Sequence, residues 1–270
     1  MTAEPDYDPA KDGEGSYLAA YEAIRLRGLA AIKREVQIGD CRLILGDCSL
    51  ILPILGRVDA VVTDPPYGIG VDKAMHKAGG TQHGVAMAAK RHYASTDWDD
   101  QPIDDATVSA LLGAAKRCII FGGNYFNLPP SRCWLVWDKK VNGEFADCEL
   151  AWTNLDKPVR RIEWMWNGML RKGQEPRFEH PTQKPLGVME WCLTHIPDAR
   201  TILDPFMGSG TTGVACAKQG RRFIGIERHE QYFDIAVKRI QDAYSRPDMF
   251  IEAERPPEPI QQPLFAEPSA

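Results

Sequence analysis

Residues 201–218 read TILDPFMGSGTTGVACAK, which is a short apolar run, a glycine-rich turn and a helical pattern in direct succession. Gly208 and Gly210 let the backbone approach a ligand where a Cβ would collide with it. The first N–H groups of the following helix are free to bind an acidic group. The next apolar run ends in Glu227, a position suited to the hydroxyls of a ribose. This stretch predicts a strand–turn–helix unit of a nucleoside-binding α/β domain.

The residues around this turn narrow the class of ligand. Asp204 precedes the turn, and no third glycine stands in the register of a dinucleotide-binding loop. A carboxylate at that place would repel a pyrophosphate and attract an ammonium group. We therefore expect a nucleoside that carries an amino acid, and we disfavour a nicotinamide-dependent dehydrogenase.

Strand-like and helix-like runs alternate along the rest of the chain. Apolar runs at residues 42–45, 58–63, 118–121, 133–137, 149–153, 201–203 and 222–226 predict strands. Residues 16–35, 49–55, 106–117, 186–195, 211–218 and 231–243 predict helices. This alternation indicates a mostly parallel sheet with helices on both faces and ligands at the carboxyl ends of the strands. We expect one domain over residues 16–246, a disordered tail at 1–15 and a flexible Pro-rich tail at 247–270.

A second turn, Asp64-Pro65-Pro66-Tyr67, ends the apolar run at residues 58–63. The two prolines fix φ and remove two backbone donors, so that nearby carbonyls stay free to accept hydrogen bonds. Asp64 adds a side-chain acceptor and Tyr67 a flat ring, a combination suited to the exocyclic amino group of a planar base. A plain strand-ending turn is the competing interpretation. The buried strand before the turn and the separate cofactor loop favour the catalytic one.

Composition limits the remaining classes of function. A net charge of −5 argues against a globally basic nucleic-acid binder, although a local basic face is enough to bind DNA. The seven cysteines are scattered without a C-x-x-C pair, and the histidines lack metal-ligand spacing. We therefore predict neither a disulfide framework nor a metal site.

Three motifs in this order resemble those of the amino-methyltransferases of DNA. They are Asp64-Pro65-Pro66-Tyr67, then His180-Pro181-Thr182-Gln183-Lys184-Pro185, then the loop from Asp204 to Thr212. With the catalytic motif first and the cofactor loop near the end, the chain resembles the circularly ordered β class over about residues 47–243. The resemblance implies a Rossmann-like, class I S-adenosylmethionine-dependent methyltransferase fold with circularly permuted motif order. It also implies direct methyl transfer from S-adenosyl-L-methionine to the N6 amino group of an adenine flipped out of DNA.

The resemblance assigns site residues position by position. The catalytic residues would be Asp64, Pro65, Pro66 and Tyr67. Glu227 would bind the ribose and Asp47 the adenine edge of the cofactor, with Thr182, Gln183 and Lys184 beside its methionine carboxylate. The methionine and sulfonium end would lie against the loop residues Asp204, Phe206, Gly208, Ser209, Gly210 and Thr211. Asn124 and Tyr125 resemble a further element near the cofactor, and a plain tight turn explains them nearly as well.

Two segments are candidates for DNA recognition, at about residues 68–105 and 154–179. They carry the predicted DNA contacts Lys73, Lys77, Lys90, Arg91, Arg160, Arg161, Arg171 and Lys172. In the second segment the basic residues stand near Trp164 and Trp166, a mixture suited to a DNA surface. A solvated loop over two core tryptophans is the equal alternative.

The sequence also suggests partners and a compartment. Gln261-Gln262-Pro263-Leu264-Phe265 resembles the peptide that docks on bacterial sliding clamps, although an incidental Pro-rich tail explains it as well. The polar N-terminus and the absence of a membrane-length apolar run predict a cytoplasmic protein of a bacterium or its phage. A homodimer stays open. The rival functions are an N4-cytosine methyltransferase, which shares fold and cofactor, and a non-catalytic DNA- or clamp-binding protein.

Overall fold

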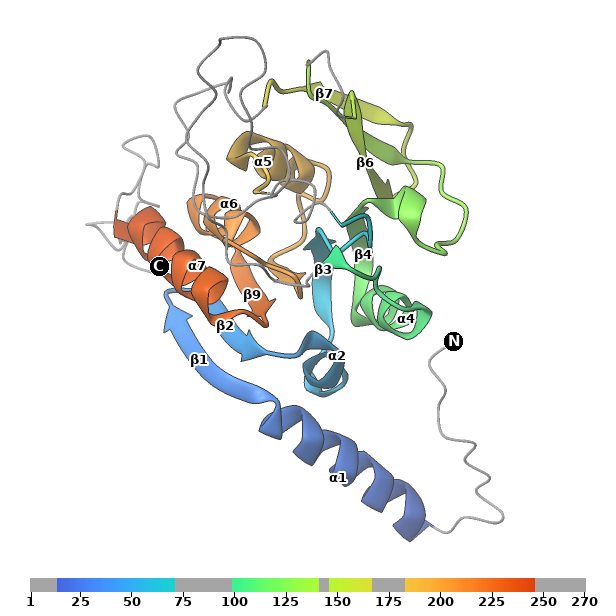
Figure 1. Cartoon of the computed structure of the whole chain (residues 1–270), viewed down its shortest axis with the longest axis vertical. Coiled ribbons are helices and arrows are strands. Elements are labelled where there is room, and N and C mark those ends of the chain that lie inside the picture. Colours follow the sequence, from blue (N-terminus) through green and yellow to red (C-terminus); the bar gives the residue numbers. More distant parts are fainter. Residues whose placement is uncertain (1–13, 71–98, 141–145, 167–182, 246–270) are drawn as a thin grey trace, which may run out of the picture.

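The computed structural model describes residues 14–70, 99–140, 146–166 and 183–245 (Figure 1). Within these ranges the strands form one sheet in the order β1-β2-β9-β8-β3-β4-β6-β5-β7. The strands are β1 Ile32–Ile38, β2 Cys41–Gly46, β3 Val58–Thr63, β4 Ala115–Phe121, β5 Trp134–Asp138, β6 Cys148–Thr153, β7 Arg160–Glu163, β8 Thr201–Asp204 and β9 Arg222–Glu227. The α-helices are α1 Glu14–Ala30, α2 Cys48–Ile51, α4 Asp105–Ala114, α5 Leu186–Thr194, α6 Thr211–Lys218 and α7 Glu230–Ser245, and η1 Leu52–Ile54 and η3 Gly123–Tyr125 are 3-10 helices.

The centre of the sheet is parallel. Strands β2, β9, β8, β3 and β4 pair with one another in parallel. Their inner residues, such as Val61, Leu203 and Ile226, are fully buried, which explains why these strands read as continuous apolar runs. Strands β1 and β6 add to the two sides in the antiparallel direction. The predicted Rossmann-like, mostly parallel α/β fold is confirmed.

Helices cover both faces of this sheet. On one face α5, α6 and α7 pack side by side, and their residues Met189, Val214 and Phe233 belong to the same core as the inner strand residues (Figure 1). On the other face α4 buries Leu111 and α2 buries Ile51. Because the central strands are parallel, the loops after β2, β3, β8 and β9 meet at one edge of the sheet.

Two predicted helices are too long, because the residues predicted at their C-terminal ends belong to strands of the sheet. The predicted helix at residues 16–35 ends at Ala30, and β1 begins at Ile32. Residues 32–38 pair antiparallel with β2 along the edge of the sheet, and their burial alternates along the strand. The predicted helix at 106–117 likewise ends at Ala114, since the next residues pair with β3. In both places pairing with another strand of the sheet overrides the helical pattern.

Strand β7, Arg160–Glu163, was not predicted, and it replaces part of the expected recognition segment at 154–179. It pairs in parallel with β5 at the outer edge of the sheet. Trp164 and Trp166, which follow it, are partly buried and pack against the main core. The indole of Trp137 donates to the carbonyl of Trp164 at 2.8 Å. These tryptophans therefore lie partly buried against the core, and their predicted contact with DNA stays a prediction.

Several predictions fall outside the described residues. They concern Lys73, Lys77, Lys90, Arg91, Arg171, Lys172, Thr182 and the Gln261–Phe265 peptide. The predicted N-terminal tail lies outside as well, except that α1 already begins at Glu14. None of the helices in the described ranges is long and apolar enough to span a bilayer. Within the same ranges, no three His, Cys, Asp or Glu side chains gather as a metal site would require.

Candidate active site

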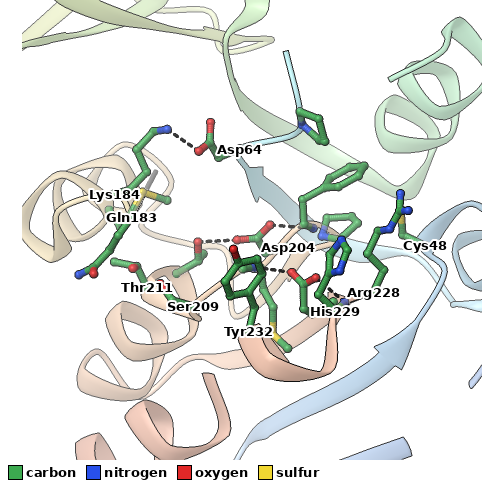
Figure 2. Close-up of a pocket in the computed structure, with 18 of the residues that line it drawn as sticks. Cys48, Asp64, Gln183, Lys184, Asp204, Ser209, Thr211, Arg228, His229 and Tyr232 are labelled. Atoms are coloured by element: carbon green, nitrogen blue, oxygen red, sulfur yellow. Dashed lines mark hydrogen bonds and ion pairs between the residues drawn. The ribbon is translucent and has the colours of Figure 1, made fainter. Parts of the chain in front are cut away.

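A pocket opens where the loops after β2, β3, β8 and β9 meet. Figure 2 shows its side chains, which come from segments far apart in the sequence. Asp64 from the loop after β3 and Gly208 from the loop after β8 line this one pocket, as the predicted site requires. The other lining residues include Asp47, Pro66, Gln183, Lys184, Asp204, Phe206, Met207, Ser209, Thr211, Thr212, Glu227, Arg228, His229 and Tyr232.

Asp204 fixes the start of the glycine-rich loop from inside the protein. Its carboxylate accepts hydrogen bonds from the Thr63 hydroxyl at 2.7 Å, the Thr212 hydroxyl at 2.6 Å and the backbone N–H of Phe206 at 3.2 Å. Burial raises the pKa of Asp204 to about 6 although these hydrogen bonds favour the charged form. Thr63 is the last residue of β3. Its hydrogen bond to Asp204 therefore connects the glycine-rich loop to the strand that directly precedes Asp64.

Glu227, at the end of β9, holds the glycine-rich loop through a second set of hydrogen bonds. Its two carboxylate oxygens accept the backbone N–H of Gly208 at 3.0 Å and of His229 at 2.8 Å. Burial raises the pKa of Glu227 to about 7, because the two N–H donors offset only part of the cost of removing the charge from water. A ligand with hydroxyl or amino donors would stabilise the ionised form of this residue.

Of the predicted cofactor residues Asp47 and Gly210, the first lines the pocket and the second does not. Asp47 lines it from the N-cap of α2, where its carboxylate accepts the backbone N–H of Ser49 at 2.9 Å. Gly210 is not a lining residue. Its φ is +79°, and a Cβ there would stand 2.8 Å from the Cβ of Ala236 in α7. The glycine is thus required by left-handed backbone and by the close packing of α6 on α7.

Arg239 on α7 holds the glycine-rich loop by hydrogen bonds, a role that was not predicted from the sequence. One of its guanidinium nitrogens donates to the Ser209 carbonyl at 2.7 Å, the Ser209 hydroxyl at 2.8 Å and the Thr211 hydroxyl at 3.0 Å. The side chain is buried. In the sequence it is one of two adjacent basic residues, Lys238 and Arg239, in an amphipathic helix, and nothing local distinguishes it.

In the turn at Asp64–Tyr67, both oxygens of Asp64 are engaged. The Tyr67 hydroxyl donates to one, and the Lys184 ammonium forms an ion pair with the other. Figure 2 shows Lys184 reaching toward Asp64 beside the pocket. Burial raises the pKa of Asp64, while the neighbouring Lys184 opposes that rise. Pro66 lines the pocket, whereas Pro65 and Tyr67 are not among its lining residues.

The ring of Tyr67 is held in an aromatic stack. Tyr125 lies parallel to it with ring centroids 5.0 Å apart, and Phe126 meets it edge-on at 6.2 Å. Gly122 at the end of β4 packs directly on the ring, since a Cβ there would come within 2.1 Å of it. Tyr125 thus contacts Tyr67 but does not line the pocket, and its predicted place near the cofactor stays a prediction.

Asp99 holds the backbone at the end of the Asp64–Tyr67 turn, a role that was not predicted from the sequence. Its buried carboxylate accepts the backbone N–H groups of Tyr67 and Gly68, both at 2.9 Å. An Asp among other acidic residues at 98–105 carries no local signal of this role. Its contacts make the backbone of the turn rigid on the side away from β3.

Three residues of the His-Pro-Thr-Gln-Lys-Pro motif lie within the described ranges, and two of them, Gln183 and Lys184, line the pocket. Gln183 and Lys184 are buried and precede α5. The Lys184 ammonium also lies 3.1 Å from Glu149 of β6, a second acidic residue that sequence reasoning missed. The predicted contact of Lys184 with a cofactor carboxylate stays a prediction, since its nitrogen is held here by protein carboxylates.

Of the predicted DNA contacts, the described ones lie away from the pocket. Arg160 and Arg161 are exposed on β7 at the outer edge of the sheet. Arg161 forms ion pairs with Glu163 at 2.7 Å and Asp138 at 3.4 Å. These two residues are not part of the cavity that contains Asp64.

Part of the chain is similar to known DNA methyltransferases. Residues 133–238 match the family model described as DNA methylase, of the N6 and N4 type. The chain is 44% identical over 84 residues to the type II methyltransferase M2.DpnII of Streptococcus pneumoniae, which is 30% of this chain and 31% of the relative. It is 34% identical over 134 residues to M.HinfI of Haemophilus influenzae, which is 47% of this chain and 37% of the relative. The chain thus spans about a third of the length of these curated relatives.

Two solved structures are similar to most of this chain at low sequence identity. A crystal structure of an M1.HpyAVI–SAM complex is similar over 74% of this chain and 99% of its own, at 24% identity and a TM-score of 0.41. The PvuII cytosine-N4-specific DNA methyltransferase is similar over 80% of this chain and 95% of its own, at 16% identity and a TM-score of 0.49. This chain is therefore similar to DNA methylases of the N6 and N4 type over residues 133–238, a segment that includes the glycine-rich loop and Glu227.

Proposed function

We propose that the chain transfers a methyl group from S-adenosyl-L-methionine to the N6 amino group of adenine in DNA. One observation carries this proposal: the acceptor-rich turn at Asp64 and the glycine-rich loop at Gly208 line the same pocket. These segments are distant in the sequence, and the parallel pairing of β3 with β8 brings them together. A pocket of this kind can present a planar base and an amino-acid nucleoside to each other.

The pocket residues fit such a cofactor. Glu227 and Asp204 are buried carboxylates with raised pKa values, so ligand hydroxyl or amino donors would stabilise their ionised forms. Asp47 adds a third carboxylate at the same pocket. A set of acids suits a ligand with ribose hydroxyls and a cationic amino-acid end better than a pyrophosphate. The cofactor, when bound, supplies an electrophilic methyl group on a sulfonium.

The chain's own residues would orient the acceptor base. A target adenine must leave the duplex to reach the pocket, which costs a few kcal/mol. The Asp64 carboxylate and the carbonyl of Pro65 would accept the two N–H bonds of its amino group, and this aims the nitrogen lone pair at the donor. Tyr67, held by Tyr125 and by the Asp99 contacts, keeps the turn rigid. Positioning in a dry site would provide most of the acceleration.

Adenine is favoured over cytosine by the residue type of the turn. Asp64 stands where the resembled N4-cytosine enzymes carry Ser, and its charge suits the amino group of adenine. The matched family covers both N6 and N4 methylation. Mass spectrometry of nucleosides from methylated DNA separates the two bases directly.

The decisive test compares wild type with Asp64→Ala in methyl transfer from tritium-labelled cofactor to unmethylated DNA. We expect Asp64→Ala to lower the rate by at least about 100-fold, because the acceptor that orients the amino group is lost. Cofactor affinity, measured by calorimetry, should stay within a few-fold, since the acids that face the nucleoside remain. Asp198→Ala, at an exposed residue that does not line the pocket, is the matched control and should transfer at a near-normal rate. A normal rate for Asp64→Ala would refute the role of this residue.

Partners beyond the target DNA are further proposals. Exposed Arg160 and Arg161 would contact phosphates at the outer edge of the sheet. The Gln261–Phe265 peptide would tether the enzyme to a sliding clamp in a bacterial cytoplasm. A pull-down with purified clamp, compared with Leu264→Ala/Phe265→Ala, tests the tether. Equal capture of both proteins would refute it.

A further inference from the structure

A row of four charged side chains runs from the catalytic turn to the outer strands of the sheet. Asp64 pairs with Lys184, Lys184 lies 3.1 Å from Glu149, and Glu149 pairs with Lys139 at 2.7 Å. The side chains of Asp64 and Glu149 are each 20% exposed, and that of Lys184 is 8% exposed. Two cations alternate with two anions, so that the row is neutral as a whole.

The Lys184 ammonium lies between two carboxylates and over two aromatic rings. Its nitrogen is 5.2 Å from the ring centroid of Phe121 and 5.7 Å from that of Tyr67. Burial alone would lower the pKa of Lys184, but Asp64 and Glu149 together raise it above its usual value. The two carboxylates therefore favour the charged form of Lys184. With either carboxylate removed, the buried cation would keep one anionic partner instead of two.

Glu149 is itself held in place from its other side. Burial favours the neutral form, yet Lys184 and Lys139 lower the pKa of Glu149 below its usual value. Lys139 lies 5.1 Å from the ring centroid of Trp137, the residue directly across from Glu149 in the β5–β6 pair. Glu149 thus carries a fixed negative charge beside the catalytic turn, at a distance set by the register of β6.

We propose that Glu149 is a positioning residue of the proposed methyl-transfer site, which holds the Lys184 ammonium in place and shares it with the Asp64 carboxylate. This inference rests on the proposed function. Lys184 so placed restrains Asp64 by one oxygen while the Tyr67 hydroxyl restrains the other. The orientation that Asp64 offers to a base is then set by residues from three separate segments of the chain.

The arrangement predicts opposite electrostatic effects for the two partners of the ion pair. The charged groups that face Asp64 are Lys184 before α5, Glu149 of β6 and Asp204 at the end of β8, and Tyr67 adds its hydroxyl. Lys184 lowers the pKa of Asp64, whereas Glu149 raises it. Removing the charge of Glu149 should therefore lower the pKa of Asp64, and removing that of Lys184 should raise it. If Glu149 and Lys184 had only a structural role, both variants would lose activity, but the pKa of Asp64 would not shift in opposite directions.

The experiment measures single-turnover methyl transfer from about pH 5 to about pH 9 for wild type, Glu149→Gln and Lys184→Met. We expect the acid limb of the profile to move down by about half a unit or more in Glu149→Gln and up by a similar amount in Lys184→Met. The plateau rate should fall about tenfold in Glu149→Gln, because Lys184 and Asp64 lose their fixed position. Glu163→Gln on the edge strand β7, where the side chain pairs with Arg161 and Lys140, is the matched control and should give the wild-type profile.

Glu149→Asp keeps the charge and serves as a second variant. It should restore the acid limb to the wild-type pH even where its plateau rate is lower. If Glu149→Gln retains the wild-type limb, or if both variants move it in one direction, the inference is overturned.

Absence of transfer by wild type would instead refute the proposed function. The pKa of Asp64 can then still be read from carboxyl carbon NMR shifts of the full chain. A lower value in Glu149→Gln than in wild type supports the electrostatic placement, and an unchanged value refutes it.

Discussion

Glu227→Gln should stabilise the protein without its ligand while weakening cofactor binding. Burial raises the pKa of Glu227 from its ordinary 4.5 to about 7, so the folded protein holds this proton more tightly than the unfolded chain does. Folding therefore binds a proton between these two pH values, and the free energy of unfolding falls as pH rises through this window. Above it, the ionised carboxylate costs about 3 kcal/mol, at about 1.4 kcal/mol for each pKa unit.

Gln removes this cost and loses part of the hydrogen bonding. The carboxylate accepts the N–H groups of Gly208 and His229 through separate oxygens, and an amide has only one oxygen. One lost hydrogen bond costs about 1 kcal/mol. The variant should accordingly be more stable than wild type by about 2 kcal/mol at pH 8.5, and slightly less stable at pH 5.

Urea unfolding of both proteins without ligand, at pH 5, 7 and 8.5, measures this difference. Calorimetry at pH 8.5 should show the affinity for S-adenosyl-L-methionine reduced by about 10- to 100-fold, because hydrogen bonds from ribose hydroxyls to a charged acceptor become neutral ones. A variant that is less stable than wild type by the same amount at every pH would refute the assignment of a buried, destabilising carboxylate. Glu163→Gln, at an exposed position, controls for general loss of negative charge and should change stability by less than about 0.5 kcal/mol.

Two further predictions concern the packing of the fold. Gly210→Ala should destabilise the protein by about 2–4 kcal/mol, since its φ is +79° and the new Cβ would stand 2.8 Å from that of Ala236. Gly113→Ala in α4, where a Cβ meets nothing within 4 Å, should instead stabilise it by about 0.5–1 kcal/mol; thermal unfolding of both variants checks the pair, and equal effects would contradict the geometry. In native protein, Cys148 should react fastest with a thiol reagent because it is the exposed cysteine, whereas burial raises the pKa of Cys48 and Cys118 to about 12. Loss of the fast phase in Cys148→Ser identifies the thiol, and its persistence would contradict the burial of the others.

The sequence determined the central architecture because its signals are local. Apolar runs predicted β3, β8 and β9 to within a residue or so, since a strand buried on both faces must be apolar along its whole length. The glycine-rich turn and the Asp-Pro-Pro-Tyr turn were recognised because their chemistry resides in consecutive residues. Their meeting in one pocket followed from the rule that loops at the carboxyl ends of parallel strands share an edge.

Tertiary structure alone decided which distant side chains complete the site. Glu149, Asp99 and Arg239 are ordinary polar residues in the sequence, and they become partners of Lys184, Tyr67 and Ser209 only through strand register and helix packing. The same holds for β1 and β7, where pairing at the edges of the sheet turned residues of helical or loop pattern into strands. A carboxylate or a strand edge acquires its role from the charge or backbone that the fold places beside it, and no local pattern encodes that neighbour.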